Sequence, residues 1–130
     1  MEAKAKILVV DDDPDIMEQV ALTLRGDGYE VRTAAGRDEA EELLLSHKPD
    51  LAILDLMMES MDAGFVLAKR VHEMYPGTPV MLLTSVTAAT GISFDSPSSE
   101  ALGWMKVAKV LDKPVRPDQL KAEVRKLLKK

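Results

Sequence analysis

The chain has 130 residues, of which 46% are hydrophobic, so it holds enough apolar material for one domain with a single core, over residues 1–130. Its net charge of −5 argues against a nucleic-acid binder, and the absence of cysteine excludes a disulfide framework and a thiolate metal site. The short apolar run after the N-terminal residues is too brief for a signal peptide or a membrane span, so we expect a cytoplasmic protein.

Apolar runs and helical periodicities alternate along the first half of the chain. Residues 6–10 are a predicted strand, and Asp13 is a predicted N-cap of a helix that has Pro14 at its first position. Gly26 and Gly28 are expected to end that helix. A short strand, a helix and a buried strand are then predicted over residues 29–34, 36–46 and 51–54.

The second half continues the alternation with one interruption. A helix over residues 64–75, a strand over 79–83, a strand over 109–111 and a final helix from Pro117 are predicted. Residues 86–105 show no clear amphipathic pattern, so we expect a long loop with at most one or two helical turns. Strands that alternate with helices through short connections predict a parallel sheet covered on both faces.

Polar residues with related chemistry follow the predicted strands. Asp11 and Asp12 follow the first, Asp55 the third, Thr84 the fourth and Lys113 the fifth. Because ligands of open parallel sheets bind at the carboxyl ends of the strands, these residues are expected to share one site. Three carboxylates there would repel one another unless a cation lies between them, and oxygen ligands suit Mg²⁺. A hydroxyl and an ammonium group could hold a phosphoryl group, and Asp55 is the candidate nucleophile.

Each of these residues also has a simpler interpretation. Asp13 is expected to be only a helix cap, and Asp11 or Asp12 alone could be a turn residue. Thr84 alone could be structural, and Lys113 could be a solvated lysine in a turn. The combination at several strand ends favours a shared functional site.

Four segments together resemble the receiver domain of two-component response regulators. They are ILVVDDDP, LDLMM, the LLTS that ends the fourth strand, and LDKPV. The resemblance implies a doubly wound, flavodoxin-like α/β fold of three layers, with a five-stranded parallel sheet in the order 2-1-3-4-5. It implies a signalling switch that Asp55 operates by accepting a phosphoryl group from a histidine kinase or phosphotransfer protein.

The resemblance also assigns roles to the other residues of the site. Thr84 and Lys113 would contact the phosphoryl group and relay its presence. The Mg²⁺ ligands would be Asp11, Asp12, Asp55 and, through its backbone carbonyl, Met57. No enzyme activity is expected beyond self-phosphorylation from a donor and slow self-dephosphorylation.

Three features depart from the family pattern. The loop after Asp55 lacks the usual proline and has one added residue, as residues 59–64 show. The span from Thr84 to Lys113 is longer than usual, so the fourth helix is expected to be short or irregular. Val110 stands where an aromatic switch residue is usual, so the usual coupling between threonine and ring cannot be transferred.

The expected output is contact with an unknown downstream protein, without direct binding of nucleic acid or membrane. No output domain follows the last helix, as in a stand-alone receiver, although a fragment of a longer regulator would look the same.

Two other functions fit parts of the pattern. A haloacid-dehalogenase-like phosphatase would use Asp11 as nucleophile and Asp13 as general acid, but it leaves Asp55 without a role. A receiver-like module that binds partners without phosphorylation is the other alternative, and the altered loop after Asp55 keeps it open.

Overall fold

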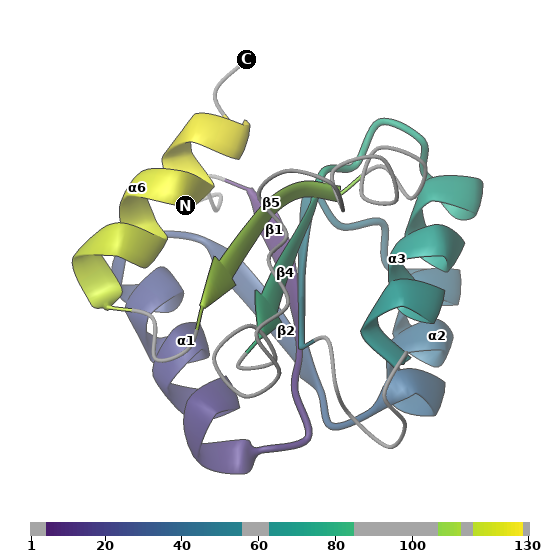
Figure 1. Cartoon of the computed structure of the whole chain (residues 1–130), viewed down its shortest axis with the longest axis horizontal. Helices are drawn as coiled ribbons and strands as arrows, with labels where there is room; N and C mark the ends of the chain where they lie inside the picture. The colour runs from purple at the N-terminus through teal and green to yellow at the C-terminus, as the bar shows by residue number, and fades with distance from the viewer. Residues whose placement is uncertain (1–4, 56–62, 85–106, 113–115, 129–130) are drawn as a thin grey trace.

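The strands of the chain form one parallel sheet in the order β2-β1-β3-β4-β5 (Figure 1). The computed structural model describes residues 5–55, 63–84, 107–112 and 116–128. The strands are β1 (Lys6–Val10), β2 (Glu30–Ala34), β3 (Leu51–Asp55), β4 (Val80–Thr84) and β5 (Val107–Asp112). The predicted α/β class with a parallel sheet is confirmed, and β3 extends one residue beyond the prediction to include Asp55.

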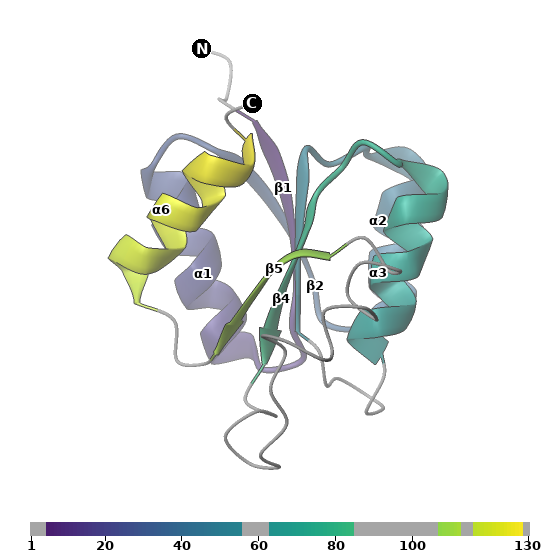
Figure 2. The same cartoon turned by 45° about the horizontal axis from the view of Figure 1, so that its top comes forward.

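Helices cover both faces of this sheet, which gives three layers (Figure 2). The helices are α1 (Pro14–Gly26), α2 (Arg37–Ser46), α3 (Ala63–Met74) and α6 (Pro117–Leu128). Helices α1 and α6 pack on one face, and α2 and α3 pack on the other. Each lies within two residues of its predicted start, because the apolar spacing and the N-terminal signals are local.

Two apolar clusters form the core, one on each side of the sheet. In β1, Ile7 and Val9 join the cluster under α1 and α6, whereas Leu8 and Val10 join the cluster under α2 and α3. This division follows from the two-residue period of a strand, which sends successive side chains to opposite faces. Both faces are therefore buried from Ile7 to Val10, which explains why this part of β1 is a continuous apolar run.

The start of α1 is set by its own residues, as predicted. The Asp13 side chain accepts hydrogen bonds from the backbone N–H groups of Asp15 and Ile16, and Pro14 occupies the first turn. These contacts satisfy donors that the first helical turn leaves without an intrahelical partner. Only three residues therefore separate the end of β1 from the start of α1.

The turn after α1 is tied to α6. Gly28 has a φ of 96°, a left-handed conformation that glycine adopts without strain, and the predicted glycine-rich helix end is confirmed.

Arg125 donates to both carboxylate oxygens of Asp27, at 3.1 and 3.2 Å. Burial raises the pKa of Tyr29 above its ordinary value of 10.0; the Asp27 carboxylate adds to the rise, and Arg125 opposes it.

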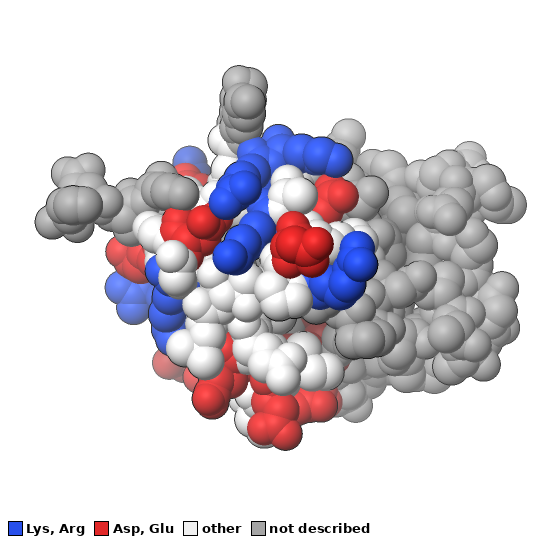
Figure 3. All heavy atoms as spheres, turned by 90° about the vertical axis from the view of Figure 1, so that its left-hand side faces the viewer, with Lys and Arg blue, Asp and Glu red and all other residues white. Residues whose placement is uncertain are grey.

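The surface that carries α1 and α6 has charges of both signs side by side (Figure 3). On α6, Lys126 lies 3.8 Å from Glu123, and Arg116 just before the helix lies 3.8 Å from Asp118. Acidic and basic side chains of the described residues are thus interspersed on this face. Among the described residues, no helix is both long enough and apolar enough to cross a bilayer.

Several sequence predictions fall on residues that the structure does not describe. The long loop over residues 86–105, and with it the short or irregular fourth helix, lies there, as do Met57 and Lys113. Only the backbone of Thr84 and of Val110 is described, within β4 and β5.

Candidate functional site

Three carboxylates meet at the carboxyl ends of β1 and β3. One oxygen each from Asp11, Asp12 and Asp55 lies within 4.8 Å of the others. Asp11 and Asp55 are 2% and 6% exposed, whereas Asp12 is open to solvent. The cluster thus combines two buried carboxylates with one that is open to solvent.

Strand alternation explains why Asp11 and Asp55 come together. Ile7 and Val9 of β1 and Ile53 of β3 lie in the cluster under α1 and α6, and both aspartates follow at the same two-residue spacing. Strands β1 and β3 pair in parallel with Val9 opposite Ile53, so their ends are level. Both carboxylates therefore leave the sheet on one side and at one height.

Asp11 is held through both its backbone and its side chain. Its N–H donates to the Ala34 carbonyl at 3.2 Å, which extends the β1–β2 pairing by one residue. Its carboxylate Oδ1 accepts from the N–H of Asp13 at 2.8 Å, which is the short-range contact of an Asx turn. The chain thereby reverses into α1 directly beside the site, and Asp12, between the two contacts, projects into solvent.

Thr84 lies at the same end of the sheet by its backbone. Asp55 pairs with Leu83 of β4, so Thr84 is one residue beyond that level. Thr84 itself pairs with Asp112 of β5, the residue directly before Lys113. The structure thus brings the backbone of Thr84 to the end of the sheet that holds the three aspartates, while Lys113 and Met57 lie outside the described residues.

One supporting group had no sequence signal. The carbonyl of Ala34 positions Asp11, but any residue supplies a carbonyl, and β2 meets β1 only in the folded sheet. Asp13, in contrast, was predicted as a cap and has that role.

The three aspartates lie at the carboxyl ends of a parallel sheet, where open α/β domains bind their ligands, and their oxygens suit a cation. Residues 7–125 match the response regulator receiver domain, and the chain belongs to that family. The resemblance drawn from the four sequence segments is therefore confirmed. Domains of this family serve as signalling switches in two-component systems and bind Mg²⁺ at an aspartate cluster.

Relatives of known sequence agree with this assignment. Transcriptional regulatory protein GlrR of Escherichia coli K12 is 36% identical over 116 residues, which are 89% of this chain and 24% of GlrR. DNA-binding response regulator MtrA of Mycolicibacterium smegmatis is 32% identical over 127 residues, which are 98% of this chain and 52% of MtrA. The chain thus spans between a quarter and about half of the length of these curated relatives.

Solved structures show the same flavodoxin-like fold. Chemotaxis protein CheY4 of Vibrio cholerae superposes with a TM-score of 0.83 at 31% identity, covering 97% of this chain and all of that one. A CheY-like receiver domain protein from Methanospirillum hungatei gives 0.82 at 26% identity, covering 95% of this chain and 93% of that one. These matches give no support to the phosphatase alternative, and the Asp13 carboxylate that it needs as general acid already caps α1.

Proposed function

We propose that Asp55 accepts a phosphoryl group from a histidine kinase or a phosphotransfer protein. The observation that carries the proposal is the placement of Asp55, buried at the end of β3 with Asp11 and Asp12 beside it. A carboxylate oxygen of Asp55 would form a bond to phosphorus while the bond from phosphorus to the donor's imidazole nitrogen breaks. The nitrogen then leaves with its electron pair and takes a proton.

The aspartate cluster fits a Mg²⁺ ion. Hard carboxylate oxygens that are open to water on one side match the ligands this ion takes in proteins. The ligands would be Asp11, Asp12, Asp55 and the backbone carbonyl of Met57. The ion supplies charge neutralisation for the incoming phosphoryl oxygens.

The remaining roles belong to side chains around Asp55. The Thr84 hydroxyl and the Lys113 ammonium would each contact a phosphoryl oxygen, because transfer depends mainly on positioning and charge stabilisation. The Asp11 N–H donates to the Ala34 carbonyl and the Asp11 carboxylate accepts from the Asp13 N–H, and these two bonds hold Asp11 in place before any ligand arrives. The backbone position of Thr84 at the same end of the sheet supports this arrangement.

The output follows from the class of protein. We infer that the chain works in the cytoplasm and signals by contact with a downstream protein, as one receiver domain over residues 1–130. Its own chemistry would be limited to phosphorylation from a donor and slow loss of the phosphate.

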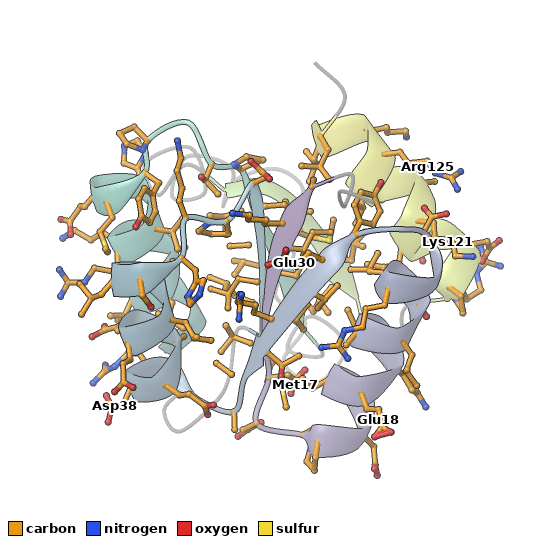
Figure 4. All side chains as sticks on the ribbon, turned by 180° about the vertical axis from the view of Figure 1, so that it is seen from behind. Met17, Glu18, Glu30, Asp38, Lys121 and Arg125 are labelled. Carbon is orange, nitrogen blue, oxygen red and sulfur yellow. The ribbon has the colours of Figure 1, made fainter. Side chains whose placement is uncertain are left out.

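The test uses acetyl phosphate as donor, with Mg²⁺ present, and maps the modified residue by reduction with borohydride and mass spectrometry. Native protein and Asp38→Asn, a control at an exposed aspartate on α2 (Figure 4), should be labelled at Asp55. Asp55→Asn should be unlabelled, with an unchanged circular dichroism spectrum. Labelling on Asp11 would favour the phosphatase, and a native protein that takes no label from this donor or from a histidine kinase would favour the binding module.

A further inference from the structure

Strand β2 is an outer strand of the sheet, with β1 on one side only. Seen from behind, it crosses in front of the other strands between α1 and α2, and no described element lies over it (Figure 4). Outer strands offer backbone donors and acceptors to a strand from another chain, and proteins usually protect them. The structure shows how this edge is protected.

The backbone groups of β2 alternate between its two edges. The N–H of Glu30, the first residue, donates to the Ala5 carbonyl at 2.9 Å, on the β1 side. The carbonyl of Ala34, the last residue, accepts from Asp11 at 3.2 Å, also on the β1 side. Successive residues of a strand direct their backbone groups to opposite edges. The backbone groups of residues 31 and 33 must therefore point away from β1.

Those outward residues are Val31 and Thr33. The carbonyl of Val31 is taken by Arg25, whose Nη2 donates to it at 2.9 Å from the last turn of α1. The guanidinium thus occupies an acceptor at the centre of the exposed edge. The N–H group of an arriving strand would have to compete with this guanidinium for the Val31 carbonyl.

The side chains of β2 make a second copy of the chain the fitting partner. Glu30 and Arg32 lie on one face of the strand, 3.4 Å apart and 40% and 46% exposed. In an antiparallel pair centred on Val31 of each copy, Glu30 of one copy lies opposite Arg32 of the other, and the reverse. Opposite charges at such positions stabilise a strand pair. The sequence of β2 is therefore complementary to itself in this register.

We propose that β2 is a self-pairing edge and that Arg25 prevents a second copy of the chain from pairing with it. The central pair of that register would exchange two hydrogen bonds between the Val31 residues. Arg25 already donates to the Val31 carbonyl in each copy, so both bonds would have to compete with a guanidinium.

The first test removes the guanidinium without removing its apolar stem. Arg25→Met keeps an unbranched side chain and a high helix propensity. Each dimer is freed of two competing hydrogen bonds, so the self-dissociation constant should fall about tenfold to a hundredfold below the native value. Sedimentation velocity over a concentration series measures it, and amide exchange of Val31 and Thr33 should slow in the dimer.

The second test reverses the charges, each in the Arg25→Met background. Arg32→Glu and Glu30→Arg each place like charges opposite one another, so each variant alone should be monomeric. An equimolar mixture should form a heterodimer, because every opposed pair is then attractive. Nonspecific association would not depend on mixing the two variants. Recovery of a dimer only in the mixture would therefore identify the proposed register.

Three results would overturn the proposal. The first is an Arg25→Met protein that is folded and as monomeric as the native one. The second is a dimer that Arg32→Glu leaves intact. The third is a native protein that already pairs through β2 and dissociates on Arg32→Glu, since Arg25 would then not prevent pairing. If Arg25→Met does not fold, Arg25→Gln removes the charge while keeping a polar side chain and serves for the same measurements.

Discussion

Removing one charge from the aspartate cluster should stabilise the protein when no divalent cation is present. The oxygens of Asp11, Asp12 and Asp55 lie within 4.8 Å, and two unit charges at that distance repel by roughly 3.5 kcal/mol at an effective dielectric constant of about 20. Asp12 is open to solvent, and salt screens its charge, so the net effect is smaller. We expect Asp12→Asn to raise the free energy of unfolding by about 1–2 kcal/mol in a chelator.

Magnesium should reduce this difference in stability. A ligand that binds only the folded state adds RT ln(1 + [L]/Kd), or about 1.4 kcal/mol when its concentration is about ten times Kd. The native protein should gain this increment, and Asp12→Asn should gain much less because it lacks one of the carboxylates. The two unfolding curves should therefore draw together as Mg²⁺ is added.

The measurement is urea unfolding followed by circular dichroism, with and without Mg²⁺. Glu18→Gln removes one charge from an exposed position of α1 outside the cluster (Figure 4). It should change stability by less than about 0.5 kcal/mol and keep the full response to Mg²⁺. The reasoning fails if Asp12→Asn is no more stable than the native protein in chelator, or if it keeps the native response to Mg²⁺.

Three further predictions address the cap, the buried phenol and the lifetime of the phosphate. Asp13→Ala should lower the free energy of unfolding by about 1 kcal/mol because two N–H groups of α1 lose their acceptor, whereas Asp13→Asn should lose less; urea unfolding measures both. The raised pKa of Tyr29 means that the unfolded chain loses this proton first, so stability should fall as pH rises above about 10. Tyr29→Phe should show a shallower fall, and an equal slope in both proteins would contradict this assignment. Met57 and Val86, two positions after Asp55 and Thr84, have side chains that cannot orient the water that hydrolyses an aspartyl phosphate. Met57→Asn with Val86→Glu should therefore speed loss of the phosphate, since orientation of the water is worth roughly 10²–10⁴-fold in rate. A double variant that hydrolyses no faster than the native protein would refute this prediction.

The interactions that the sequence determined act over short distances along the chain. Asp13 caps a helix two and three residues away, so the start of α1 could be predicted from adjacent residues. The continuous apolar runs of β1 and β3 indicated strands buried on both faces, because each face needs its own apolar side chains. Asp55 could be singled out because one carboxylate ended such a run.

The sequence pattern did not by itself set the order of the strands. That order was inferred from the resemblance to receiver domains, since periodicity shows that a strand is buried but not which strand lies beside it. The observed pairing of β1 with β3 places Asp11 and Asp55 at one level.

Only the tertiary structure decided the contacts that join distant segments. Asp11 depends on a carbonyl of β2, and the edge of β2 depends on a guanidinium from α1, although no motif marks either partner. The pKa of Tyr29 is likewise raised by burial and by the neighbouring Asp27, with Arg125 of α6 opposing it. Hydrogen bonds and charges act over a few ångströms in space, so their partners are known only once the sheet has brought the segments together.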